Sequence, residues 1–155
     1  MPIIKAILAS LLTLTVTSSV TFGSELLRTP ATIVGDNYGF TEGPVWVKDK
    51  KIWLFTDIPM NKIYSLDSNG KVNVWLEDSG YANGLNIDKD NNIWIAHHCR
   101  KVSKTTPKGK NYIVASTYNG KKLNSPNDIA IRKDGSTWFT DPMYGITLKG
   151  FGCEA

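Results

Sequence analysis

Three oxygen-bearing side chains occupy the same place in a recurring pattern, 11 residues before a tryptophan. They are Glu42, Asn83 and Asn127. Carboxylate and amide oxygens suit a hard cation such as Ca²⁺, whereas softer metals favour His or Cys. A buried carboxylate also needs a partner to offset its desolvation. The pattern predicts a cation or ligand site if the three side chains converge. The alternative is that the Asn side chains bond the backbone at the starts of strands.

A second polar set follows the same tryptophans by four, four and three residues: Asp57, His98 and Asp141. We expect this set to lie at the same end of the repeated unit, further from the centre. Asp141 is expected to support the site through hydrogen bonds, and Asp57 to serve a turn. His98 could assist Zn²⁺, but no second histidine stands at ligand spacing.

The elements that must position these residues are repeated β-hairpins. The segments "EGPVWVKDKKIW", "NGLNIDKDNNIW" and "NDIAIRKDGSTW" each alternate apolar residues, turn at Asp, Asn or Gly, and end in Trp. Weaker strands follow in the first two repeats, at 62–67, 71–76, 101–106 and 111–116. Four strands per unit at a period of about 40 to 45 residues predict an all-β fold of the β-propeller class. No helix is expected after residue 23.

Propeller geometry predicts where the polar residues lie. The first strand of each blade lines the central channel, so equivalent positions of successive blades form a ring. Glu42, Asn83 and Asn127 should therefore meet at the end where first strands begin. The tryptophans repeat at one blade position, and we expect them in the core rather than on a sugar-stacking surface.

Residues 1–23 have the layout of a signal peptide, with one Lys, an apolar run and then small residues. The apolar run is too short for a membrane span, which needs roughly 20 residues. We expect an exported protein, periplasmic or secreted, with a partial propeller over 24–155 and no stable membrane anchor after cleavage. Export permits a disulfide between Cys99 and Cys153, and two free thiols fit the sequence equally well.

The formal net charge is +4, and basic residues are densest over 101–122. They are mixed with Thr, Gly and Asn rather than interleaved with aromatic residues on a recognisable module. This composition argues against a nucleic-acid partner and favours solvated strand ends and turns.

Two stretches resemble a known family: "FTEGPVW" and "KKLNSPNDIAIRKDGSTWFTDPMYGI". They are similar to the gluconolactonase branch of the senescence-marker-protein, gluconolactonase and luciferin-regenerating-enzyme family. The resemblance covers about residues 34 to 155. It implies a six-bladed propeller, of which this chain holds about two and a half to three blades. It also implies one divalent cation in the channel and hydrolysis of sugar lactones or related esters.

The resemblance implies a role for each candidate residue. Glu42 and Asn127 would hold the cation, with Ca²⁺ the first choice and Zn²⁺ or Mg²⁺ as alternatives. Asn83, Asn127 and His98 would bind a sugar lactone, with Asp141 and Tyr144 in supporting positions. The remaining ligands and the general base would lie beyond Ala155.

The chain departs from the family pattern because only the N-terminal half is present. A fragment of a longer reading frame, a truncated product, or several copies assembled through an unpaired blade edge would each explain this. Two other functions stay open on the same scaffold. One is a non-catalytic module that binds a small ligand or peptide, and the other is a related ester or phosphotriester hydrolase.

Overall fold

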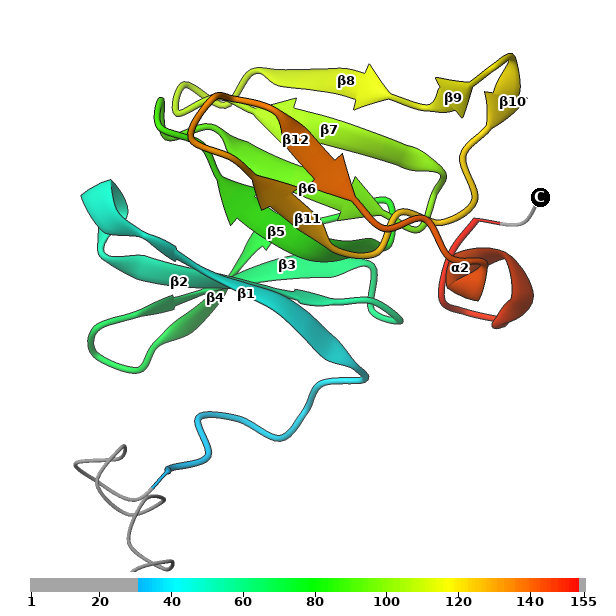
Figure 1. Ribbon diagram of the computed structural model, residues 1–155. Helices are drawn as coiled ribbons and strands as arrows, with labels where there is room; N and C mark the ends of the chain where they lie inside the picture. Colours follow the sequence, from blue (N-terminus) through cyan, green and yellow to red (C-terminus); the bar gives the residue numbers. More distant parts are fainter. Residues whose placement is uncertain (1–30, 154–155) are drawn as a thin grey trace, which may run out of the picture. The chain divides into compact units, whose positions relative to one another are not determined.

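The computed structural model describes residues 31–153 (Figure 1). The chain divides into one unit of residues 1–34 and a second of residues 35–155. The predicted signal peptide at residues 1–23 lies outside the described residues. Within the described part, no helix is long and apolar enough to cross a membrane.

The first four-stranded sheet, blade 1, contains β1 (Thr41–Val47), β2 (Ile52–Asp57), β3 (Lys62–Asp67) and β4 (Val72–Leu76). The strands pair antiparallel in chain order. The turn before β4 is closed by Asp67, whose carboxylate accepts hydrogen bonds from the N–H groups of Asn69 and Lys71. Asp suits this place because its short side chain bonds nearby backbone groups.

The second sheet, blade 2, repeats this order with β5 (Ala82–Ile87), β6 (Ile93–His97), β7 (Lys101–Thr105) and β8 (Asn111–Ala115). Its first turn is organised by Asp88, which accepts hydrogen bonds from Asn92 and from the indole Nε1 of Trp94 at 2.8 Å. Burial of the carboxyl raises the pKa of Asp88 and these hydrogen bonds lower it, and the net effect is a lowered pKa.

The third repeat contributes one hairpin, β11 (Ile129–Ile131) with β12 (Thr137–Phe139). A short hairpin of β9 (Thr117–Tyr118) and β10 (Lys121–Lys122) precedes it. The predicted strands of all three repeats are present within a residue or two, which confirms the all-β fold. The expectation of no helix is wrong at two short places: the 3₁₀ turn η1 (Lys48–Lys50) and α2 (Tyr144–Thr147).

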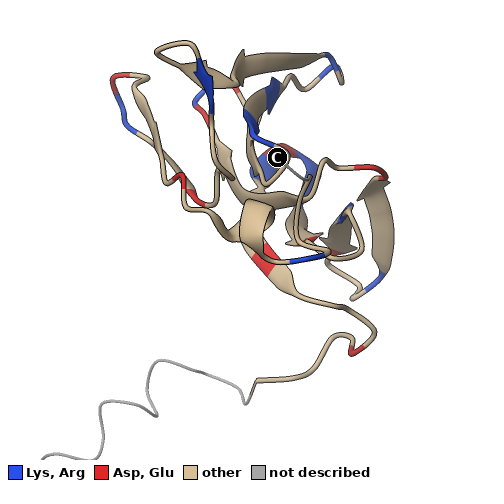
Figure 2. Cartoon of the chain, turned by 90° about the vertical axis from the view of Figure 1, so that its right-hand side faces the viewer, with Lys and Arg blue, Asp and Glu red and all other residues tan. Residues whose placement is uncertain are grey.

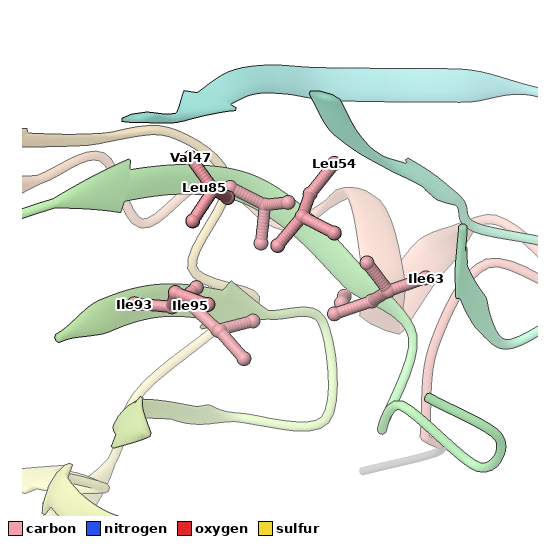
Figure 3. Close-up of a cluster of buried hydrophobic side chains, with 7 residues drawn as sticks. Val47, Leu54, Ile63, Leu85, Ile93 and Ile95 are labelled. Atoms are coloured by element: carbon pink, nitrogen blue, oxygen red, sulfur yellow. The ribbon is translucent and has the colours of Figure 1, made fainter. Parts of the chain in front are cut away.

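Apolar packing joins the blades. β1 and β2 pack on β5, and β5 and β6 pack on β11. The larger cluster lies between blades 1 and 2 and has Leu54, Ile63 and Ile95 at its fully buried centre (Figure 3). Each such side chain contributes about 1.5–3 kcal/mol on burial. A smaller cluster of Ala96, Val102 and Ile129 joins blade 2 to the third hairpin.

Strand pairing gives Trp94 and Trp138 the same position and shifts Trp53 from it, and two of the three are exposed, so the prediction that all three are core residues is wrong. Trp94 pairs with Asn86 in β5 and packs on the smaller cluster. Trp53 pairs with Trp46, and these two rings lie 5.4 Å apart with Trp53 46% exposed. Trp138 is 63% exposed. An indole is buried only where another blade packs against the face of the sheet from which it projects. Within residues 31–153, only Trp94 of the three has such a neighbour.

Charged residues of both signs are spread over the described chain (Figure 2). The basic stretch 101–122 falls on β7, the β7–β8 turn, β8 and the β9–β10 hairpin. Lys104 lies over the ring of Trp94, with Nζ 5.2 Å from its centre. The expectation of solvated strand ends holds for Lys108, Lys110, Lys121 and Lys122, which are exposed.

Candidate functional site

Successive repeats are hydrogen-bonded to each other at the end where their first strands begin. The hydroxyl of Thr56 donates to the carbonyl oxygen of Asn83 at 3.0 Å, and the N–H of Gly84 donates to the carbonyl oxygen of Asn127 at 2.7 Å. Glu42 lies opposite Thr56 in the β1–β2 pair. The backbone at Glu42, Asn83 and Asn127 is therefore brought to one place.

Glycine follows the first two of these residues because the next strand passes close by. A Cβ on Gly43 would overlap the carbonyl oxygen of Asn83. On Gly84 it would lie 2.6 Å from the carbonyl oxygen of Asn127 and 2.7 Å from the Cα of Asp128. Real Cβ atoms do not approach backbone this closely, so the small residue sets the separation between adjacent blades.

Asn83 and His98 form a buried pair in blade 2. The Asn83 Nδ2 and His98 Nε2 atoms are 2.9 Å apart, and the two residues are 4% and 2% exposed. The other ring nitrogen, Nδ1, bonds the carbonyl oxygen of Phe151. Both nitrogens of His98 are thus engaged within the protein.

The segment after β12 covers His98. Gly145 in α2 lies against the His98 Cβ and donates its N–H to the Ser125 hydroxyl at 2.8 Å. Cys99 is disulfide-bonded to Cys153, with their Cα atoms 4.7 Å apart. The structure thereby selects the disulfide from the two alternatives that the sequence left open.

The charge of Glu42 acts on His98 in this pair. Burial lowers the pKa of His98, while the Phe151 carbonyl and the negative charge of Glu42 oppose that shift. Glu42 itself is exposed, and Asn127 is half-buried. The set at this end consists of one carboxylate and two amide groups, which are oxygen donors. Among residues 31–153, no three His, Cys, Asp or Glu side chains are grouped as a metal site would require.

Strand pairing shows that the second polar set contains a different residue of the second repeat from the one that the tryptophan spacing predicted. Thr41 pairs with Asp57 and Ala82 with His97, each one residue before Glu42 or Asn83. The equivalent of Asp57 is therefore His97, not His98 as the tryptophan spacing predicted. Asp141 stands three residues after Trp138, as His97 does after Trp94, and completes this set.

Each member of the corrected set, Asp57, His97 and Asp141, is hydrogen-bonded to the segment that precedes the first strand of its repeat. Asp57 accepts hydrogen bonds from the N–H groups of Gly39 and Phe40 at 2.8 and 3.0 Å. His97 Nδ1 bonds the Ser79 carbonyl oxygen at 2.7 Å. These bonds span 17 and 18 residues, so the prediction that Asp57 serves a local turn is wrong.

Asp141 makes the corresponding bond in the third repeat, where its Oδ2 accepts from the N–H of Asn124 at 2.9 Å. Its Oδ1 is buried and has no partner among the described residues. Tyr144 begins α2 and is 53% exposed. The hydrogen bonds of Asp141 hold the loop that precedes Asn127.

His97 was missed from the sequence because the spacing of four residues between Trp53 and Asp57 pointed to His98 in the second repeat. The Nε2 of His97 lies 2.7 Å from the Ser103 hydroxyl, and the His97 side chain is 3% exposed. Burial lowers the pKa of His97 to about 4, and the positive charge of Lys101 acts in the same direction against the opposing Ser79 bond. His97 is a neutral structural residue at neutral pH. The pairing of Ala82 with His97 reveals its equivalence to Asp57, and the three-residue spacing that His97 and Asp141 share after Trp94 and Trp138 is the signal in the sequence.

Comparisons with known proteins agree with this architecture. A curated gluconolactonase from Zymomonas mobilis is 34% identical over 136 residues, which cover 78% of this chain and 38% of that protein. A solved structure described as a gluconolactonase from Xanthomonas campestris matches with a TM-score of 0.75 and 29% identity, over 79% of this chain and 41% of that one. A luciferin-regenerating enzyme matches at TM-score 0.55 and 16% identity, covering 77% of this chain and 42% of that one, and shows the shared fold alone.

The chain spans about two fifths of the length of these relatives. The family model described as the SMP-30/gluconolactonase/LRE-like region matches residues 40–150, which include all three repeats and α2. Two blades and the first hairpin of a third thus form part of a β-propeller. The chain belongs to the SMP-30/gluconolactonase/LRE-like family.

Proposed function

We propose that the protein containing this chain hydrolyses sugar lactones with the help of a divalent cation, and that Ca²⁺ is the ion that fits best. The observation that supports this most directly is the bonded arrangement of the Glu42, Asn83 and Asn127 positions at one end of three adjacent first strands. The gluconolactonase names of the relatives support the substrate class.

The residues present fit a hard cation because every donor they offer is an oxygen. Glu42 supplies an exposed carboxylate, and Asn127 supplies a half-buried amide. When bound, the cation would polarise the lactone carbonyl and stabilise the negative oxygen that forms as water attacks. A site of six to eight oxygens needs more ligands than these residues offer. Water and residues beyond Ala155 would complete it.

The chain's own residues would bind and orient the substrate. Glu42 and Asn127 would fix the ion-binding end of the channel, and the amide of Asn83 would face the sugar or the ion. Both nitrogens of His98 are engaged by Asn83 and Phe151. We therefore propose that His98 acts through Asn83 rather than on the sugar itself. The carboxylate that activates water would lie beyond Ala155.

The test is δ-gluconolactone hydrolysis by the protein as its gene encodes it, with and without a chelator. Turnover should stop in the chelator and return with added Ca²⁺. Glu42→Gln keeps the shape and removes the charge, so it should lower kcat/KM by roughly 100-fold or more. Glu77→Gln is the matched control, because Glu77 is exposed and its one ion pair within residues 31–153 is with Lys62 at 3.2 Å.

Turnover that survives both the chelator and Glu42→Gln would refute the cation role. Ligand binding without turnover would favour a non-catalytic propeller. Faster cleavage of simple esters or phosphotriesters than of lactones would favour the related hydrolase.

We also propose that the protein is exported to the periplasm or the medium. The Cys99–Cys153 disulfide supports this, since disulfides persist in oxidising compartments. N-terminal sequencing of the protein recovered outside the cytoplasm should find a new terminus near residue 23. An uncleaved Met1 terminus in the cytoplasmic fraction would contradict export.

A further inference from the structure

The hydrogen bonds around His98 determine which ring nitrogen carries the proton. Nδ1 bonds the Phe151 carbonyl oxygen, and a carbonyl can only accept. Nδ1 must therefore be the N–H donor. In a neutral ring the lone pair then lies on Nε2, which is 2.9 Å from the Asn83 Nδ2 atom.

The ring in turn determines the orientation of the Asn83 amide. An asparagine amide has an NH₂ group that donates and an oxygen that accepts. With the lone pair of His98 Nε2 facing it, the amide must present its NH₂ group to the ring. Its oxygen, Oδ1, then points away from His98. Among the described residues, no hydrogen bond ends on Asn83 Oδ1, so this oxygen remains available.

A covalent link holds the Phe151 carbonyl in place. Cys99 follows His98 directly, and Cys153 stands two residues after Phe151. Their disulfide spans 54 residues of chain and fixes the C-terminal segment beside the ring. Within this segment Gly152 packs against the backbone of Gly145, and a Cβ on Gly152 would overlap it.

We propose that His98 is a positioning residue: together with the Phe151 carbonyl and the Cys99–Cys153 disulfide, it turns the Asn83 amide so that its oxygen, not its nitrogen, faces the channel. An oxygen at this place can bind a cation or accept a hydrogen bond from a sugar hydroxyl. That use of the oxygen rests on the proposed function, whereas the orientation does not.

The orientation can be tested on the 155-residue chain without cation or substrate. Long-range ¹H–¹⁵N spectra of the His98 ring should show a protonated Nδ1 and an unprotonated Nε2. A nitrogen–nitrogen coupling across the hydrogen bond should link Asn83 Nδ2 to His98 Nε2. A ring protonated at Nε2 instead, with no such coupling, would overturn the proposal.

Two substitutions separate the positioning role from simple space filling. His98→Gln can still offer an acceptor oxygen where Nε2 lies. His98→Asn keeps a donor near Phe151 but is too short to reach Asn83. The Asn83 side-chain amide signals should stay close to wild type in His98→Gln and shift in His98→Asn. Equal shifts in both variants, with the fold intact by circular dichroism, would reduce His98 to a packing residue and overturn the proposal.

The covalent link has its own control. In the Cys99→Ser/Cys153→Ser variant, the Phe151 carbonyl is released and the ring should populate both tautomers. If that variant does not fold, reduction of the folded native chain gives the same comparison. An unchanged Nδ1–H tautomer after reduction would remove the disulfide from the proposal.

The consequence for the site is measured by Ca²⁺ titration calorimetry on the full-length protein. Residues that orient ligands typically change affinity by roughly 10- to 100-fold. His98→Asn should therefore bind Ca²⁺ at least tenfold more weakly than His98→Gln. Equal affinities would overturn the functional part. If the wild-type protein binds no Ca²⁺, the cation role in the proposed function fails, and the nitrogen spectra still decide the orientation.

Discussion

The N–H of Gly84 donates a hydrogen bond to the carbonyl oxygen of Asn127 at 2.7 Å. This bond joins the first strand of blade 2 to the loop that leads into β11, 43 residues later. It exists because Gly84 has no side chain to separate the two backbones. The spacing of the candidate site residues is therefore set by backbone contact between blades.

Gly84→Ala should destabilise the chain. Its Cβ would lie 2.6 Å from the Asn127 oxygen and 2.7 Å from the Asp128 Cα, and neither backbone can move without shifting a strand. We expect a loss of about 1–3 kcal/mol in the free energy of unfolding by urea, with faster hydrogen exchange at residue 84. Gly70→Asn is the control, since Gly70 faces open space and Asn tolerates its positive φ. Equal stability of Gly84→Ala and wild type would contradict the close approach.

Stability should fall as the pH drops from about 6.5 to 4. The folded-state pKa of His97 is lowered from 6.5 to about 4, so the unfolded chain binds a proton in this range and the folded chain does not. The full difference corresponds to about 3 kcal/mol, all of it present above pH 6.5. The lowered pKa of His98 adds to the loss in the same direction.

Urea midpoints measured from pH 7 to pH 4.5 check the slope. His97→Asn keeps a donor toward Ser79 and cannot titrate, so its midpoint should vary less with pH than that of the native chain. An identical slope in both proteins would assign the pH dependence to other groups.

Reduction of the Cys99–Cys153 disulfide should cost about 4 kcal/mol, because it closes a loop of 54 residues in the unfolded chain. Urea unfolding with and without a reducing agent measures this. The Cys99→Ser/Cys153→Ser variant should unfold at the same urea concentration in both conditions. Thiol titration of the denatured, unreduced protein should find no free thiol, and finding two would contradict the disulfide.

Substituting the three repeat tryptophans by Ala should give unequal losses. Trp94 packs between blade 2 and the third hairpin and donates to Asp88, so Trp94→Ala should cost about 3–5 kcal/mol. Trp53 and Trp138 are 46% and 63% exposed, and their variants should each lose less than about 1.5 kcal/mol. Equal losses at all three positions would restore the equivalence inferred from spacing.

The 155-residue chain should self-associate, because β12 is an unpaired edge among the described residues and carries the exposed Trp138. Sedimentation velocity over a range of concentrations measures this. Trp138→Lys places a charge on the edge and should shift the chain toward monomer. Lys133→Ala, in the turn before β12, should not. A wild-type chain that stays monomeric at every concentration would contradict the prediction.

The strands could be predicted from the sequence because their signals are local. Alternating apolar residues and turns rich in Asp, Asn and Gly marked both arms of all three hairpins. The family motifs then indicated which polar residues are candidates for the site. Glu42, Asn83 and Asn127 indeed stand at neighbouring strand starts, because each repeat begins at the same point.

The equivalence of the second arms could not be predicted because pairing register is a property of two strands. Four residues separate the paired Val47 and Ile52, whereas five separate Ile87 from Ile93 in blade 2. The β1–β2 turn is one residue shorter than the β5–β6 turn. Strand β1 also stays paired for one residue more beyond Glu42 than β5 does beyond Asn83. Trp53 and Trp94 both stand 11 residues after the first polar residue of their repeat, and this shared spacing hid a one-residue shift in register. By strand pairing, the equivalent of Trp94 in blade 1 is Leu54.

The sequence could not decide between a Cys99–Cys153 disulfide and two free thiols, because residues 54 apart are brought together only by the third hairpin and α2. The disulfide also determines what happens when a protease cuts the chain. Residues 100–152 form a closed covalent loop, and the β7–β8 turn within it exposes Lys108 and Lys110. A trypsin-like protease that cuts there leaves the two pieces attached, and only a reductant would separate them on a gel. A nick in this turn therefore does not release the segment that covers His98.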